Sequence, residues 1–226
     1  GLKLKSTIDY SYLGMTPEAA AEWQRQAERE FELWAESKFC DATRSNNFYE
    51  IQQTALMSWL MNGDACVLVE YERPKKFFPY GLRVRLIESD RVSTPHTTGN
   101  TVNLYAKDLQ TGNRIYNGVE LNDAGQIVAY HICSTYPNSN LHAEKKWTRV
   151  KAFGDKTGIP NVLMIYETER PEQYRGVPYL APVIDSLKQL TRYSEAEQMA
   201  AVINGFFTVF ITSESGAQDV GFTGVV

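Results

Sequence analysis

The sequence lacks most of the features that mark a secreted, membrane-spanning or metal-dependent protein. It contains three cysteines and three histidines in 226 residues, and no two cysteines have the CxxC spacing of a zinc or redox motif. No run of about 18 uncharged apolar residues is present, and Gly1 to Lys3 do not resemble a signal peptide. We therefore expect neither a membrane protein nor a secreted one, and we expect Cys66 and Cys133 to be reduced, buried thiols.

An excess of positive charge is missing as well. The chain has 23 Lys and Arg against 27 Asp and Glu, a net charge of -4 and a pI of about 5.5. Overall electrostatics therefore give no affinity for nucleic acid, and any DNA contact has to be local. With 43% hydrophobic residues, the chain is long enough to bury a sizeable core in one large domain or two small ones.

Motifs for nucleotide hydrolysis and covalent catalysis are also absent. The stretch 154–158 contains the Lys-Thr pair of a phosphate-binding loop, but Asp155 stands where that loop requires glycine. No Gly-x-Ser-x-Gly elbow occurs. His131 and Cys133 share one face of a predicted strand, yet two possible ligands do not make a metal site. The residues thus indicate no catalytic, cofactor-binding or metal site.

Two amphipathic helices are expected in the first third of the chain. The first begins after Thr16, a good N-cap residue, with Pro17 at the first helical position. Its apolar stripe consists of Ala20, Trp23, Ala27, Phe31 and Trp34. The second follows Asn46-Asn47 and ends at Gly63. Its expected buried side chains are Ile51, Ala55, Leu56, Trp59 and Leu60.

Strands and turns are expected in the middle of the chain. Residues 65–71 form an apolar, β-branched run typical of a buried strand. Residues 118–121 and 127–133 flank a clear hairpin loop, and 162–167 is another strand candidate. Helices first, strands next and a long helix last predict an α+β fold with N-terminal helices, a central and mostly antiparallel β region and a long C-terminal helix.

The last quarter of the chain is its most distinctive part. Arg175-Gly176-Val177-Pro178 has the composition of a loop, since glycine supplies unusual backbone angles and proline biases its predecessor away from the helix. Pro182 suits the first turn of a helix. Apolar residues then recur at helical spacing as far as Phe206, which predicts a helix of about 20–25 residues, roughly 30–37 Å long.

This stretch resembles the lambda-type portal proteins of tailed bacteriophages. Their characteristic run Arg-Pro-x-Gln-x-Arg-Gly-Val-Pro-x-Leu-Ala-Pro-Val stands here as Arg170, Pro171, Gln173, Arg175, Gly176, Val177, Pro178, Leu180, Ala181, Pro182 and Val183. A helix with Glu195, Ala200-Ala201 and an aromatic-rich end follows, as in that family. Weaker matches at 1–5 and 118–130 extend the resemblance over nearly the whole chain.

The resemblance implies a structural protein without enzymatic activity, cofactor or membrane attachment. Subunits of this family form a closed ring, usually dodecameric, at the unique capsid vertex. The ring is the channel for packaging and ejecting double-stranded DNA, which it contacts without sequence specificity. It also docks the terminase large subunit, capsid proteins and head-tail connector proteins. The protein would therefore belong to the virion, and to the host cytoplasm during assembly.

The resemblance also implies a division of the chain. Residues 1–176 would form a wing-like α+β body, 177–211 a long stem-like helix, and 212–226 a flexible tail leading to a clip region outside this sequence. Family members are considerably longer, so we expect this chain to be a fragment. The candidate stem or channel residues are Asp185, Lys188, Arg192 and Glu195. Together with Glu197 they carry two positive and three negative charges, which is compatible with a weak grip on DNA.

A basic and aromatic stretch at 73–85 leaves other interpretations open. Its five cations, with no acid between them, are Arg73, Lys75, Lys76, Arg83 and Arg85. Cations and flat rings together suit a nucleic-acid-binding module, but a solvated loop or a contact with the capsid or a neighbouring subunit fits as well. A second basic stretch spans 145–151. The remaining alternative is an enzyme whose site combines His131 and nearby carboxylates with segments outside this chain. Such a site should show a pocket and a strongly shifted pKa.

Overall fold

The computed structural model describes residues 1–95, 104–137 and 144–206, which belong to two compact units. The larger unit extends from Gly1 to Ala181, and the second begins at Pro182. Helices come first, antiparallel strands follow and a helix comes last, so the predicted α+β class is confirmed.

Helices α1 (Pro17–Glu36) and α2 (Phe48–Asn62) open the larger unit. The side chain of Thr16 caps α1 by accepting a backbone N–H of the first turn. Asn47 and the glutamate three residues later form a capping box at the start of α2. At the other end of α2, Gly63 adopts a left-handed conformation with φ of 93°. All three of these predicted helix boundaries are confirmed.

The predicted apolar stripes of the two helices are only partly buried. Trp34 and Ile51 are buried in one cluster, but Trp23 is 49% exposed and Leu56 is 51% exposed. The expectation that Trp23 and Leu56 face the core was wrong. Only the C-terminal turns of α1 reach the core cluster, and the buried stripe of α2 is a narrow i, i+4 row that leaves Leu56 beside it.

The strands form two antiparallel sheets. The first has the order β2-β1-β8, with β1 at Ala65–Tyr71, β2 at Leu82–Ile87 and β8 at Val162–Ile165. The second is a meander of β3 (Tyr105–Lys107), β4 (Arg114–Tyr116), β5 (Val119–Leu121), β6 (Ile127–Cys133) and β7 (Trp147–Lys151). The β5–β6 hairpin lies where it was predicted, and β8 is two residues shorter than expected. Short 3-10 helices span Lys38–Cys40 (η1), Ser89–Arg91 (η2) and Ala181–Val183 (η3).

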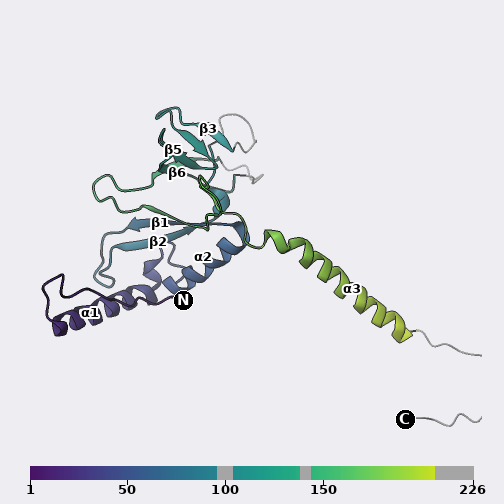
Figure 1. Ribbon diagram of the computed structural model, residues 1–226, viewed down its shortest axis with the longest axis horizontal. Helices are drawn as coiled ribbons and strands as arrows, with labels where there is room; N and C mark the ends of the chain where they lie inside the picture. The colour runs from purple at the N-terminus through teal and green to yellow at the C-terminus, as the bar shows by residue number, and fades with distance from the viewer. Residues whose placement is uncertain (96–103, 138–143, 207–226) are drawn as a thin grey trace, which may run out of the picture. The chain divides into compact units, whose positions relative to one another are not determined.

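The larger unit has three layers, with α1 and α2 on one side of the first sheet and the second sheet on its other side (Figure 1). Strand β1 lies in the middle, so both of its faces are buried. Cys66 packs into the cluster between the sheets, and Val67 packs into the cluster beneath the helices. Burial raises the pKa of Cys66 to about 12, and Cys133 is equally buried. Both are therefore free, buried thiols, as predicted.

Helix α3 (Ile184–Phe206) makes up nearly all of the described part of the second unit, and none of its 23 residues is buried. The segment predicted as helix from residue 177 begins instead with a turn at 179–180 and with η3. Pro178 and Pro182 explain the later start, because proline lacks an N–H and biases its predecessor away from helical angles. The predicted aromatic-rich end of the helix and the tail at 212–226 lie outside the described residues.

Candidate functional site

The side chain of Arg175 is the centre of the motif that precedes α3. Its Nε and Nη2 atoms donate to the two carboxylate oxygens of Asp64, at 2.5 and 3.1 Å. Its Nη1 donates to the carbonyl oxygens of Val92 and Asn117, at 2.7 and 2.8 Å. Nη2 also donates to the carbonyl oxygen of Ser89, at 2.9 Å. All five N–H groups of the guanidinium are therefore used.

These acceptors come from segments that are far apart in the sequence. Asp64 lies between α2 and β1. Ser89 lies in η2 and Val92 directly follows it, and Asn117 lies in the turn between β4 and β5. Arg175 thus joins both sheets and the end of α2 to the segment that leads to α3. The Asp64 side chain is 2% exposed and that of Arg175 is 11% exposed, so removal of either would leave the other charge buried and unpaired.

Gly176 brings the motif backbone into direct contact with the end of α2. A Cβ at Gly176 would lie 1.8 Å from the carbonyl oxygen of Gly63, and a Cβ at Gly63 would lie 2.5 Å from the carbonyl carbon of Val177. Only glycine fits at either position. The sequence suggested unusual backbone angles at Gly176, but Gly176 does not have a positive φ. Glycine is required there by the close approach of two backbones.

Replacing Gly176 with alanine is therefore expected to destabilise the larger unit by about 2 kcal/mol. The added methyl group would collide with backbone atoms of Gly63, which cannot move aside as a flexible side chain could. Gly205 offers a contrast, since a Cβ there meets nothing within 4 Å and the residue lies in α3. The Gly205→Ala variant should not destabilise, and it should favour the helix by about 1 kcal/mol. Urea unfolding of the two variants checks the difference, and equal effects would contradict the close-contact argument.

The other motif residues organise the loop before α3. Gln173 donates from Nε2 to the carbonyl oxygen of Arg175 at 3.0 Å, and its Oε1 accepts the backbone N–H of Glu169 at 2.9 Å. The carbonyl of Pro178 accepts the N–H of Ala181 in the turn that leads to η3. Arg170 and Pro171 are exposed. The motif is therefore mainly a structural anchor, and Arg170 is the one cation in it that remains at the surface.

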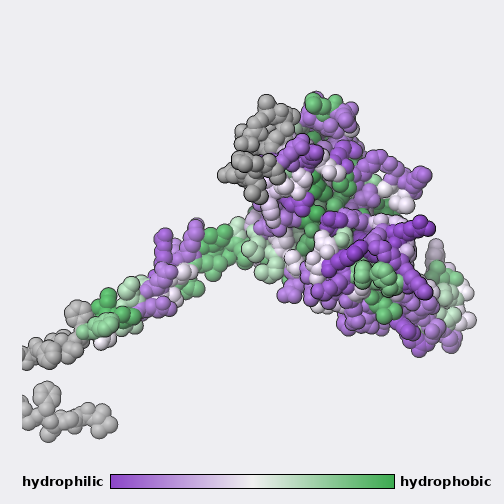
Figure 2. Space-filling model, turned by 180° about the vertical axis from the view of Figure 1, so that it is seen from behind, coloured by the Kyte–Doolittle hydropathy of each residue, from purple (hydrophilic) through white to green (hydrophobic). Residues whose placement is uncertain are grey.

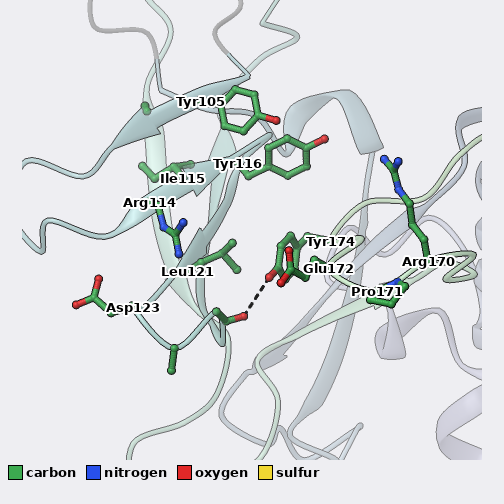
Figure 3. Close-up of a pocket in the computed structure, with 13 residues that line it drawn as sticks. Tyr105, Arg114, Ile115, Tyr116, Leu121, Asp123, Arg170, Pro171, Glu172 and Tyr174 are labelled. Carbon is green, nitrogen blue, oxygen red and sulfur yellow. Dashed lines mark hydrogen bonds between the residues drawn. The ribbon is translucent and has the colours of Figure 1, made fainter.

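Arg170 and Pro171 lie at the edge of a cavity of about 770 Å³ between the second sheet and the motif loop. Tyr105 and Tyr116 lie on its sheet side, with their ring centroids 4.9 Å apart and their planes tilted by 47°. Tyr174 donates across the cavity to the carbonyl of Gly125 (Figure 3). The complete lining is Tyr105, Ala106, Arg114, Ile115, Tyr116, Leu121, Asp123, Ala124, Gly125, Arg170, Pro171, Glu172 and Tyr174. With two arginines and two carboxylates, the cavity has no net charge to select a ligand.

The basic stretch at 73–85 is partly neutralised in three dimensions. Arg83 is buried and its Nε pairs with Glu72 at 3.2 Å, while Lys75 pairs with the same carboxylate at 2.5 Å. Arg85 donates two hydrogen bonds to Glu70. Both acids precede the basic run, so counting charges within the run missed them. Antiparallel pairing of β1 with β2 brings Glu70 to Arg85 and Glu72 to Arg83. Cations of the second basic stretch, 145–151, are also paired with carboxylates; Lys151, for example, forms an ion pair with Asp155.

Arg73 and Lys76 are the exceptions. Both are exposed, and neither forms an ion pair within the part of the chain that the structure describes. Of the five predicted contact cations, these two are available to a partner.

Glu120 is a fully buried acid that several donors surround, and it bears on the enzyme alternative. Its carboxylate accepts from Arg149 at 2.7 and 3.0 Å, and it lies 3.1 Å from Nε2 of His131. Thr111 and Asn113 donate to it as well. Burial alone would raise the pKa of Glu120, but these hydrogen bonds outweigh burial and lower it to about 2.

Glu120 has a strongly shifted pKa, as expected of an active-site residue, but its cluster is closed to solvent and substrate. The Glu120 side chain is 0% exposed and that of His131 is 7% exposed, so a substrate cannot reach them. A carboxylate with a pKa of about 2 also remains charged at neutral pH and cannot act as a general acid. The geometry is that of a structural ion cluster. Across the described residues, no three His, Cys, Asp or Glu lie together as a possible metal site.

The candidate stem residues lie together on α3. Asp185, Lys188, Arg192 and Glu195 are spaced by three, four and three positions, which places them on one face. All four are exposed, and none forms an ion pair within the described chain. No helix in the described segments has the length and apolar character needed to cross a membrane.

The chain belongs to the lambda family of phage portal proteins, because the sequence model of that family matches residues 1–223. Its relatives include the portal protein of Escherichia phage N15, 24% identical over 96% of this chain and 38% of the relative. Portal protein B of Escherichia phage lambda is 22% identical over the same shares. A probable portal protein of Halomonas phage phiHAP-1 is 25% identical over 88% of this chain and 33% of the relative. The chain thus spans about two-fifths or less of these relatives.

Proposed function

We propose that this chain supplies the wing-like body and the first channel-side helix of a subunit in a closed portal ring, through which double-stranded DNA enters and leaves a phage head. The observation that carries the proposal is α3, a 23-residue helix with no buried residue. Apolar side chains that are unburied within one chain call for partner surfaces. Their display along the helix, interrupted by hydrophilic side chains, is visible in Figure 2.

The apolar side chains of α3 lie on two sides. Leu187 and Leu190 share one side near the start of the helix, and they are 51% and 61% exposed. Met199, Val202, Ile203 and Phe206 share another side near its end. At 100° per residue the two sides are on the order of 140° apart. The second of these sides is also the one that carries Asp185, Lys188, Arg192 and Glu195 nearer the start of the helix. The side of Leu187 and Leu190 is therefore the one that suits contact with a neighbouring subunit, as the head-to-tail contacts of a closed ring require.

The charged face of α3 suits the channel side of such a ring. Asp185, Lys188, Arg192 and Glu195 carry two negative and two positive charges, so this face has no net charge. A wall of strong positive charge would bind the phosphate backbone and slow its passage. A mixed, neutral face lets DNA slide without sequence specificity. We assign docking of the terminase and of head-tail connector proteins to the longer parent protein, together with residence in the virion after assembly in the host cytoplasm.

Electron microscopy and native mass spectrometry of the full-length parent protein test the proposal. We expect a closed ring of the twelve subunits usual in the family, and loss of that ring when Leu187 and Leu190 are replaced with asparagine. The matched control replaces Lys188 and Arg192 with glutamine on the charged face, and it should leave the ring intact. A parent protein that stays monomeric at high concentration would overturn the proposal.

A further inference from the structure

The tip of the β1–β2 hairpin, residues 72–81, is ordered by backbone hydrogen bonds. Lys75 and Phe78 exchange two backbone hydrogen bonds of 3.0 Å, and Glu72 donates its N–H to the carbonyl of Gly81. Phe78 is buried and anchors the tip, whereas Phe77 is 67% exposed and rests on the ring of Phe39 at 5.2 Å. A rigid tip with one exposed ring is pre-organised for binding.

The hairpin tip is positively charged although the whole chain is acidic. The Glu72 carboxylate pairs with three cations, Arg44, Lys75 and Arg83, so that this group retains a charge of +2. Arg73 and Lys76 add two further exposed charges. Carboxylates of a partner would therefore be attracted to the tip.

An apolar groove of about 440 Å³ lies between the returning arm of the tip and α1. It is lined by Glu30, Phe31, Trp34, Pro79, Tyr80, Gly81 and Leu82. Its polar groups are already satisfied, since the Trp34 indole N–H donates to the carbonyl of Leu82 and the Tyr80 hydroxyl donates to Glu30. An apolar side chain can enter this groove without leaving a buried donor unpaired.

The two features together favour an acidic protein segment over nucleic acid. The Glu72 group retains two positive charges, and Arg73 and Lys76 add two more, so the tip could neutralise about four phosphates. Four contacts give a salt dependence with a slope of only about −4 and correspondingly weak binding. DNA would also leave the apolar groove empty. An amphipathic segment uses both features, because its apolar face fills the groove and its carboxylates meet the cations.

We propose that the hairpin tip and the adjoining groove dock an acidic, amphipathic segment of a partner protein. Apolar side chains of that segment lie against Phe31, Trp34 and Leu82. Its carboxylates pair with Arg73 and Lys76, and Phe77 packs on its apolar face. This docking goes beyond ring formation and is independent of it, because every residue involved lies in one larger unit.

Fluorescence anisotropy with the whole 226-residue chain tests the docking. The probe is a labelled helical peptide of about 16 residues, with leucines at i, i+3 and i+4 spacing and glutamates elsewhere. The comparison probes are a scrambled peptide of the same composition and a DNA duplex of similar length. The variants are Arg73→Ser with Lys76→Ser, and Phe77→Ser. The matched control, Arg114→Ser with Lys156→Ser, removes the same charges from exposed positions elsewhere.

We expect the amphipathic peptide to bind at least tenfold tighter than the scrambled one. Each tip variant should bind the amphipathic peptide at least tenfold more weakly than the wild type, and the control should bind it less than twofold more weakly. Three outcomes would overturn the proposal: no binding of the amphipathic peptide, equal loss in the control, or a scrambled peptide that binds as well as the patterned one. Tighter binding of the duplex, lost in the tip variants, would also overturn it and assign the tip to nucleic acid instead.

Discussion

Replacing Arg175 with methionine should lower the free energy of unfolding by about 4 kcal/mol. The substitution leaves the Asp64 carboxylate buried with one remaining hydrogen bond, from the N–H of Gly176, and an unpaired buried charge typically costs 3–5 kcal/mol. Three backbone carbonyls, of Ser89, Val92 and Asn117, lose a donor as well. Urea unfolding followed by tryptophan fluorescence measures the loss.

The matched control is Arg170→Met, five residues earlier in the same motif. Arg170 is exposed, so its replacement should change the free energy of unfolding by less than about 0.5 kcal/mol. Arg175→Lys should recover only part of the stability, because an ammonium cannot reach acceptors on both sheets at once. Similar values for Arg175→Met and Arg170→Met would refute the anchoring role of the guanidinium.

The second large effect concerns acid stability and Glu120. The pKa of Glu120 is lowered from 4.5 to about 2 in the folded protein, where hydrogen bonds outweigh the opposing effect of burial. Between about pH 4.5 and pH 2, Glu120 is therefore protonated in the unfolded chain but remains charged in the folded one. The stabilisation is complete above about pH 5 and is lost as the pH falls toward 2, a change on the order of 3 kcal/mol.

Unfolding free energies between pH 2 and pH 7 check this effect for Glu120→Gln against the wild type. The variant should be much less stable near neutrality, and its deficit should shrink as the pH falls, since the wild type alone loses the carboxylate contribution. Glu167→Gln serves as the control, because it replaces an exposed carboxylate in a loop. A deficit for Glu120→Gln that stays constant from pH 5 to pH 2 would mean that the carboxylate is not specifically held in its charged form.

Local features of the fold could be predicted from the sequence because local chemistry determines them. The caps at Thr16 and Asn47 and the stop at Gly63 depend on residues within one turn. The β5–β6 hairpin likewise depends on the loop between its strands. By contrast, periodicity identifies the apolar face of a helix but not how much of that face meets the core, and so Trp23 and Leu56 were placed wrongly.

The candidate site was predictable only in outline. Resemblance indicated which motif residues matter, but the partner of Arg175 is Asp64, 111 residues away, and no pattern in the sequence links them. The ion pairs of the hairpin tip were missed for a related reason. Glu72 lies outside the run of cations and is brought to Arg83 only by the antiparallel register.

The distance in sequence between Asp64 and Arg175 also has a consequence for the order of folding. A contact across 111 residues encloses both sheets, and the entropy of closing so long a loop is recovered only after the intervening strands have paired. The anchor should therefore close late, and its loss should mainly accelerate unfolding. The segment that leads to α3 is thus fixed only when the body is complete. In the ring proposed above, an incompletely folded subunit would therefore lack an anchored segment before its helix.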